Sequence, residues 1–252
     1  MIYSINGSEA LRGMQMVTSR GTGLAHWSAE FFGPRDTTMD ASHPAAMLPH
    51  ALVTEMAPNE TILPHFHGVA QFQVFSGGSG SMGRNEVRPL TVQFKDHHTA
   101  YGPVVAGPQG LTFFAMRMQA YNSAPVYLNK PGYREQMKPG PRRNLLSAPV
   151  VLSTPPVLQH RQEAAREALY AEEYADGLSA QLWRLGSGMA TTSPHGAGGL
   201  YLFVVNGSLE RAGGILPQWS MLALGTGESA IEIKAGATGL EVLVLQFPRE
   251  SD

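Results

Sequence analysis

Two segments of the chain repeat each other at a fixed distance, and this repeat limits the possible folds more than any other feature. AGPQGLTFFAMR begins at Ala106 and AGATGLEVLVLQF begins at Ala235, an offset of 129 residues. The same offset places QFQVFSGG at 71–78 on LYLFVVNG at 200–207 without a gap. Two anchors that share one offset indicate two copies of one module.

Each copy consists of short segments rich in Val, Phe, Leu and Thr and bounded by Gly, Pro or Asn, which is typical of strands joined by turns. Charged residues make up only 15% of the chain, and its 28 glycines and 18 prolines favour tight turns over helices. We therefore predict an all-β protein. The pattern predicts one connecting helix, at 158–177, where four alanines recur at helical spacing and Gly177 provides a stop.

The predicted organisation follows from the positions of the two copies. We expect an N-terminal arm at 1–44, a first barrel at 45–125, a linker and helix at 126–177, and a second barrel at 178–252. The arm has no clear pattern and is expected to add strands to a neighbouring sheet or subunit. Because exposed sheet edges invite pairing and two-fold contacts are the commonest assembly, we expect a homodimer.

Composition excludes several classes of function. A net charge of −2 without a strongly basic run argues against a nucleic-acid partner. The absence of cysteine excludes disulfides, thiolate catalysis and cysteine-bound zinc. No stretch approaches 18 uninterrupted apolar residues, so no membrane partner is expected. The first residues also lack the basic and apolar segments of a signal peptide, which leaves the cytoplasm as the expected location.

The stretch LPHFHGVAQFQVFSGGSG at 63–80 carries the strongest chemical pattern. His65 and His67 are two residues apart, so on a strand they project from the same face, and Gln71 and Gln73 share that parity. Two imidazoles and an amide oxygen inside a barrel form a pocket for a divalent ion. Imidazole suits Fe, Zn, Ni, Cu and Mn, and a carbonyl oxygen favours Mn or Fe. We expect one divalent transition metal, namely Fe, Mn, Ni or Zn.

The spacing resembles the first motif of the cupin superfamily, whose members fold as double-stranded β-helix or jelly-roll barrels. That motif is a glycine, five residues, His-x-His, three or four residues, an acid, six residues and a glycine. Asn59, His65, His67, Gln71 and Gly78 occupy these places at matching distances. Asn tolerates the positive φ of the first glycine, but the amide of Gln71 brings no charge. Some cupin metal sites combine Gln with histidines, so the resemblance still implies a metal at His65, His67 and Gln71.

The second cupin motif supplies one more histidine, and the matching region here is VQFKDHHTAYGPVVAGPQG at 92–110. The Pro-x-Gly turn that precedes this histidine in the family is absent. His98 is the expected metal ligand, with His97 and Tyr101 as alternatives. Counting back from the GPQG turn places the family's histidine near Tyr101.

The second copy provides an internal comparison. At the offset of 129 the candidate residues His65, His67, Gln71, Gln73 and His98 become Pro194, Gly196, Leu200, Leu202 and Gly227. The second barrel therefore lacks every candidate ligand, and we expect it to be apolar and structural. The histidines are thus not a requirement of the repeated module.

The resemblance implies two tandem cupin barrels with one metal site, in the first. We expect a metal-dependent enzyme of the oxygenase or lyase type that acts on a small organic molecule. Tyr101, or a histidine that does not bind the metal, is the expected proton carrier. Arg117 and Gln73 are the expected substrate contacts, because arginine binds carboxylates through two parallel hydrogen bonds; an exposed arginine at a strand end is the other interpretation. The alternative function is a non-catalytic cupin that binds a small ligand or has a structural or assembly role.

Overall fold

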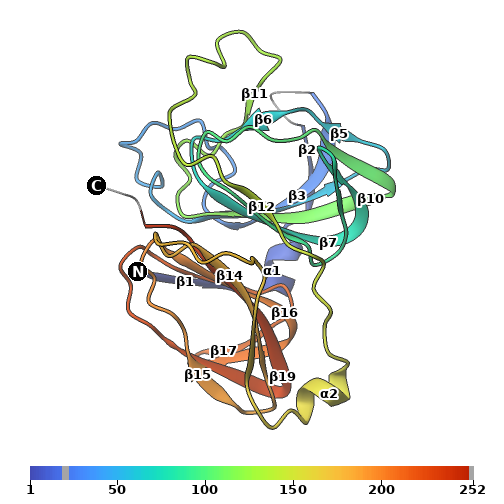
Figure 1. Ribbon diagram of the computed structural model, residues 1–252, viewed down its shortest axis with the longest axis vertical. Coiled ribbons are helices and arrows are strands. Elements are labelled where there is room, and N and C mark those ends of the chain that lie inside the picture. The colour runs from blue at the N-terminus through green and yellow to red at the C-terminus, as the bar shows by residue number, and fades with distance from the viewer. Residues whose placement is uncertain (19–22, 250–252) are drawn as a thin grey trace. The chain divides into compact units, whose positions relative to one another are not determined.

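A computed structural model describes residues 1–18 and 23–249 of the chain (Figure 1). In this part of the chain the only helices are α1 (Gly7–Leu11) and α2 (Pro155–Gln159), and strands make up nearly all other regular structure. The all-β prediction is confirmed. The chain divides into two compact units, one formed by Gly13–Val150 and the other by Met1–Arg12 with Val151–Asp252.

The unit Gly13–Val150 is a jelly-roll-like arrangement of antiparallel strands. Its strands are β2 (Gln15–Thr18), β3 (Ala25–Phe32), β4 (His50–Met56), β5 (Thr61–Ile62), β6 (His65–Phe66), β7 (Gln71–Met82), β8 (Asn85–Val87), β9 (Val92–Lys95), β10 (Val104–Arg117), β11 (Val126–Tyr127) and β12 (Asn144–Leu146). The main sheet has the order β12-β9-β7-β10-β4-β3-β2, with β5 on β10 and β8 on β7, and β6 pairs with β11. We call this unit the first barrel.

The other unit has the same type of architecture, and we call it the second barrel. Its strands are β1 (Ile2–Ile5), β13 (Ala165–Ala168), β14 (Ser179–Leu185), β15 (Ala190–Thr192), β16 (Leu200–Arg211), β17 (Gly214–Pro217), β18 (Met221–Leu224) and β19 (Glu232–Gln246). Their order is β1-β18-β16-β19-β14-β13, with β15 on β19 and β17 on β16. The long pair β16–β19 corresponds to β7–β10 of the first barrel.

The strand registers confirm the offset of 129 residues. Gly78 lies opposite Leu111 in the first barrel, and Gly207 lies opposite Leu240 in the second. The two glycines also share a left-handed backbone, with φ of +67° and +69°. The repeat in the sequence is therefore a repeat in structure, residue by residue.

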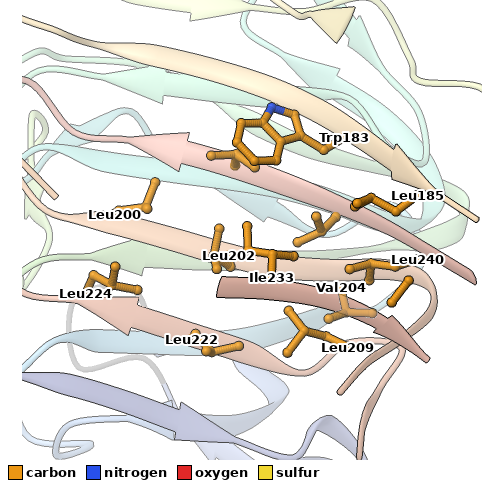
Figure 2. Close-up of a cluster of buried hydrophobic side chains, with 13 residues drawn as sticks. Trp183, Leu185, Leu200, Leu202, Val204, Leu209, Leu222, Leu224, Ile233 and Leu240 are labelled. Carbon is orange, nitrogen blue, oxygen red and sulfur yellow. The ribbon is translucent and has the colours of Figure 1, made fainter. Parts of the chain in front are cut away.

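The second barrel is filled by apolar side chains, as expected. Leu200 and Leu202 are completely buried, and Figure 2 shows them on β16 among the aliphatic side chains of neighbouring strands. Trp183 on β14 belongs to the same cluster. Alternate residues of β16, such as Tyr201 and Phe203, are also fully buried, so this strand is covered on both faces.

The predicted helix at 158–177 is wrong. α2 ends at Gln159, and 165–168 form the edge strand β13, which pairs with β14. An alanine face buries little apolar area, whereas the strand gains backbone hydrogen bonds and charge contacts. The guanidinium of Arg166 lies 3.9 Å from the centre of the Trp183 ring, and Arg184 forms an ion pair with a glutamate of the edge strand.

The observed units have different boundaries from the predicted domains. The expected arm at 1–44 is divided, because β1 pairs with β18 of the second barrel while β2 and β3 extend the sheet of the first. β12, beyond position 125, pairs with β9 and closes the other edge of that sheet. No helix in the described residues is long and apolar enough to cross a membrane.

Candidate functional site

A cavity of about 800 Å³ opens into the first barrel. Its wall combines apolar side chains with polar groups, and five of the residues singled out from the sequence line it: His65, His67, Gln73, Tyr101 and Arg117. They come from β6 and the residue after it, from β7 and β10 of the main sheet, and from the segment before β10. The size and mixed lining suit a small organic ligand.

His65 and His67 are both oriented by backbone carbonyl groups. Nδ1 of His65 lies 2.7 Å from the carbonyl oxygen of Leu63, and Nδ1 of His67 lies 2.7 Å from that of Ser123. A carbonyl oxygen only accepts, so each Nδ1 carries the proton and each Nε2 presents a lone pair. The rings lie edge to face with centres 5.1 Å apart. This orientation is typical of histidines that bind metals through Nε2.

Tyr101, one of the alternatives for the third position, lies beside His65 and His67 in the same cavity. Its backbone forms two hydrogen bonds with that of His65, of 3.1 and 3.0 Å, and the two rings have centres 4.3 Å apart. The Tyr101 hydroxyl lies 3.1 Å from Nε2 of His67, to which it donates, and it accepts from Nε2 of Gln71 at 2.9 Å. The phenol therefore lies between the two expected ligands His67 and Gln71.

Arg117 forms hydrogen bonds with Gln71 and His50 and lies close to His67. Its Nε donates to the amide oxygen of Gln71 at 3.0 Å, and its Nη1 donates to Nδ1 of His50 at 3.0 Å. Its Nη2 lies 3.5 Å from Nε2 of His67. The hydrogen bonds thus run in one direction, from Arg117 through Gln71 and Tyr101 to His67, and they hold the phenol and the amide in place.

Lys95 on β9 is a second buried cation near the site and was not singled out from the sequence. It is 1% exposed, and its Nζ donates to the amide oxygens of Gln73 at 2.6 Å and Gln93 at 2.9 Å. The same nitrogen lies 3.0 Å from the centre of the Tyr101 ring, on its face. Lys95 does not line the cavity itself and lies against Tyr101 and Gln73, which do.

Burial keeps the histidines of the site neutral. Together with the nearby Lys95 and Arg117, and against the hydrogen bond to Leu63, it lowers the pKa of His65 to about 3. Burial, followed by Arg117, also holds the pKa of His67 well below its usual range. Burial raises the pKa of the Tyr101 phenol, so this group stays protonated near neutral pH. Neutral imidazole is the form that binds metal ions.

His98, the expected third histidine ligand, is not brought into the cavity. Its backbone nitrogen bonds to the carbonyl oxygen of His67 at 2.7 Å, but its own φ is +53°, in the left-handed region. This backbone conformation places the His98 ring against the Phe66 ring, and the two ring centres are 5.6 Å apart. Phe66 lies between His65 and His67 in the sequence. His98 therefore lines a separate pocket, and His97 lies beside Gly140. Of the three alternatives, Tyr101 is the one that lines the cavity with His65 and His67.

The second barrel shows that the polar residues of the site are not required by the fold. In the first barrel Gln71 lies opposite Lys95 and Gln73 opposite Gln93; in the second, Leu200 lies opposite Leu224 and Leu202 opposite Leu222. Four polar positions thus correspond to four leucines, all labelled in Figure 2. Burying polar groups costs free energy. Because these groups occur in only one of the two barrels, they indicate a function in that barrel.

The donor atoms of the site fit a divalent transition-metal ion. Because Nδ1 of each ring is held by a carbonyl oxygen, His65 and His67 would bind an ion through Nε2. Nε2 of His67 now accepts from the Tyr101 hydroxyl, and the amide oxygen of Gln71 accepts from Arg117, so an ion would replace these two hydrogen bonds. The set lacks a carboxylate: the described residues contain no cluster of three or more His, Cys, Asp or Glu suited to a metal. We therefore expect weaker binding than at a site with an acidic ligand.

Comparison with solved structures identifies the fold of this chain, whereas comparison of sequences identifies no family. No model of a known protein family matches the chain, and no curated protein matches it in sequence. A bacterial pirin from Escherichia coli, solved in complex with nickel(II), matches with a TM-score of 0.58 and 12% identity over 99% of this chain and 100% of the pirin. A putative dioxygenase from Nostoc punctiforme matches with a TM-score of 0.62 and 8% identity. The match covers 100% of this chain and 84% of the dioxygenase.

A variant of oxalate decarboxylase from Bacillus subtilis also matches, with a TM-score of 0.58 and 9% identity over 98% of this chain and 78% of the enzyme. All three are cupin-fold proteins. This chain has the cupin fold. The cupin resemblance expected from the 63–80 stretch is thus confirmed at the level of fold, and identities this low establish nothing further.

The repeat supplies a matched substitution for the proposed amide ligand. Gln71→Leu is expected to weaken metal binding roughly tenfold without unfolding the barrel, because Leu200 occupies the corresponding position. Gln71→Glu is expected to keep or raise the affinity, since the carboxylate adds charge, although Arg117 neutralises part of it. Titration calorimetry of the metal-free protein with Mn²⁺ and Ni²⁺ measures both. An unchanged affinity in Gln71→Leu would show that Gln71 is not a ligand.

Lys95 and His50 lie near the site but were not predicted from the sequence. Lys95 alternates with Gln93 along TVQFK, which places the two on one face of β9. His50 lies directly opposite Arg117 in the β4–β10 register, but that pairing is not visible before the strands are aligned. Both side chains are polar groups in strands that are otherwise mostly buried and apolar.

Proposed function

We propose that the first barrel is the catalytic half of a two-barrel cupin enzyme that uses a divalent metal to act on a small organic molecule. The observation that carries this proposal is the group of two carbonyl-oriented imidazoles and a phenol, His65, His67 and Tyr101, on the wall of a cavity of about 800 Å³. The second barrel serves as a structural partner, because its matching positions are apolar.

Nε2 of His65 and Nε2 of His67 would hold the ion, with the oxygens of Gln71 and Tyr101 beside it. A bound ion of this kind supplies a Lewis acid or an oxygen-binding centre. The identity of the metal is expected among Fe, Mn, Ni and Zn, since imidazole suits all four. The pirin that matches this fold was solved with nickel(II), which is in keeping with an imidazole-lined site.

Tyr101 is the residue that we propose to move a proton. Its hydroxyl donates to Nε2 of His67 and accepts from Gln71. If an ion were held at Nε2 of His67, the hydrogen of the Tyr101 hydroxyl would be free to be donated to an oxygen or carbon of a molecule in the cavity. The raised pKa of the phenol keeps it protonated, so it acts as a general acid, and Lys95 on its ring face fixes the ring.

A second function has a specific observation in its favour. The hydrogen bonds from Arg117 through Gln71 and Tyr101 to His67 satisfy these groups within the protein. A non-catalytic cupin that binds a small ligand without metal would show the same arrangement. Metal content of untagged protein separates the two functions.

The experiment that tests the enzyme proposal compares metal-free protein with protein restored with Fe²⁺, Mn²⁺, Ni²⁺ or Zn²⁺. Oxygen uptake and substrate consumption are measured with a panel of carboxylated and phenolic compounds. We expect turnover that depends on one of the ions and falls roughly 100-fold in Tyr101→Phe, the usual effect of losing a general acid. Turnover that is independent of metal, or unchanged in Tyr101→Phe, would contradict the proposal.

A further inference from the structure

His50, on β4, lines the cavity but takes no part in the metal site or in the proton step proposed above. The residue is only 2% exposed. Its Nδ1 lies 3.0 Å from Nη1 of Arg117 and 3.2 Å from the hydroxyl of Ser123. The other ring nitrogen, Nε2, is buried and has no hydrogen-bond partner among the described residues. One end of the imidazole is therefore fixed, and the other end lacks a partner.

The contact with Arg117 determines which nitrogen of His50 carries the proton. A guanidinium N–H only donates, so Nδ1 accepts, and the proton of the neutral ring lies on Nε2. Burial, followed by the charge of Arg117, lowers the pKa of His50 to about 3, so the ring is neutral near neutral pH. His50 thus carries an Nε2–H donor, whereas His65 and His67 have their proton on Nδ1.

An N–H donor that is buried without an acceptor costs free energy, and most buried donors in proteins are paired. An acceptor from outside the chain would remove this cost. Because His50 belongs to the lining of the cavity, a molecule bound there is the source of such an acceptor.

The fold does not require an imidazole at this place. At the offset of 129 residues, His50 corresponds to Ser179 and Arg117 to Gln246. The registers agree, because His50 lies opposite Arg117 and Ser179 lies opposite Gln246. A barrel of the same architecture therefore accommodates a small side chain here. The imidazole is a property of the first barrel and its cavity.

The strands that carry His50 and Arg117 also provide an apolar surface beside them. Residues that line the cavity lie in opposite pairs on β4 and β10: His50 with Arg117, Leu52 with Ala115, and Thr54 with Phe113. Thr54 corresponds to Trp183, which belongs to the apolar cluster that fills the second barrel. The first barrel is thus open along this wall, at a place where the second barrel is filled.

We propose that His50 donates through Nε2 to a carbonyl oxygen of the molecule bound in the cavity, and that the apolar part of this molecule lies against Leu52 and Phe113. A carbonyl oxygen only accepts, so it satisfies a lone N–H donor without needing a donor-acceptor pair in return. A hydrocarbon would leave Nε2 unpaired. This inference rests on the proposed function and deepens it, because it names the substrate class as a carbonyl compound and assigns the selection of that group to His50.

The first part of the test checks the proton position. The full chain is labelled with ¹⁵N and treated with a chelator, so that a carbonyl compound cannot bind through a metal. Nitrogen–proton correlation spectra of the histidine rings then identify the protonated nitrogen of each ring. We expect His50 to be neutral with its proton on Nε2, and His65 and His67 to have their proton on Nδ1. A cationic His50, or one protonated on Nδ1, would contradict the inference.

The second part of the test uses pairs of probes that differ only in the acceptor. Cyclohexanone is compared with methylenecyclohexane, and acetophenone with α-methylstyrene, in which a carbon replaces the carbonyl oxygen. We expect at least one ketone to shift the Nε2–H signal of His50 and to bind roughly fivefold more tightly than its alkene, the usual effect of one neutral hydrogen bond. Affinities are taken from the same titrations.

Four variants separate the donor from the shape of the cavity. His50→Ser carries the residue of the second barrel and should lower ketone affinity to that of the alkene. His50→Gln keeps an acceptor for Arg117 and an N–H donor, and should recover part of the affinity. Thr54→Trp should abolish binding of both probes by filling the cavity, and it is independent of His50. His160→Ser changes an exposed histidine of the other unit and should bind like the parent. Thermal unfolding confirms that each variant is folded.

The outcomes separate this inference from the proposed function, because metal content is measured on separate samples of the same protein. Ketone binding at His50 in a protein that cannot be loaded with metal would support the carbonyl site and overturn the metal-dependent enzyme. Metal loading without ketone binding would overturn the carbonyl site alone. Equal affinity for a ketone and its alkene, or parental ketone affinity in folded His50→Ser, would also contradict the inference.

Discussion

Replacing His65 and His67 together by alanine is expected to reduce the metal content of the purified protein from about one ion per chain to background. Both histidines line the same cavity, and each would bind an ion through Nε2 because its Nδ1 is held by a backbone carbonyl. The remaining oxygens of Gln71 and Tyr101 are neutral donors that cannot hold an ion alone. Elemental analysis of untagged protein measures the loss. The melting temperature should then no longer respond to added metal, since an ion that binds only the native state stabilises it by about 2.7 kcal/mol at 100 times Kd.

The adjacent histidines supply the control for that experiment. His97→Ala with His98→Ala removes two imidazoles that lie outside the cavity, and it should leave the metal content unchanged. Loss of metal in this second variant, with metal kept in the first, would mean that the ion is bound at the His98 pocket.

Adding a methyl group at Gly78 or at Gly207 is expected to destabilise the corresponding barrel by roughly 3–5 kcal/mol. Each glycine has a positive φ, and a Cβ would lie 2.1 Å from the carbonyl oxygen of Gly110 in the first barrel or Gly239 in the second. These oxygens belong to the facing strand, so the sheet itself must shift. Denaturant unfolding of Gly78→Ala and Gly207→Ala measures the two effects separately.

Gly188→Ala is the matched control for the glycine prediction. Gly188 also has a φ of +69°, but a Cβ there would have no atom within 4 Å. Only the strain of the left-handed backbone remains there, so Gly188→Ala is expected to lower the free energy of unfolding by about 1–2 kcal/mol. A cost for Gly78→Ala no larger than that for Gly188→Ala would show that the strands β7 and β10 shift to admit the methyl group, and that the repeat is less constrained than its geometry indicates.

The repeat explains why so much of the fold could be predicted. Gly78 and Gly207 occupy the same place in the two copies, inside β7 and β16, and the alternation of residues before each glycine separates inward from outward side chains. The polar residues Gln71 and Gln73, compared with Leu200 and Leu202 at the matching positions, indicated which barrel holds the candidate site. These signals are local, because strand parity and turn chemistry depend on neighbouring residues.

The errors concern features that depend on distant contacts. The alanines at 158–177 have helical spacing, but the segment gains more from pairing at the edge of a sheet. His98 is close in sequence to Tyr101, but a left-handed residue in the turn sends its ring to another pocket. The contact of Arg117 with His50 joins strands 67 residues apart. No pattern within one strand reveals such a pairing.

The most direct test of the central claim is the position of the metal ion itself. Crystals of the full chain grown with Ni²⁺ or Mn²⁺ would be measured at the absorption edge of the metal. The account predicts one anomalous peak per chain, in the first barrel, within coordination distance of Nε2 of His65 and Nε2 of His67. A peak in the second barrel or at His98, or no peak in protein that retains its fold, would contradict it.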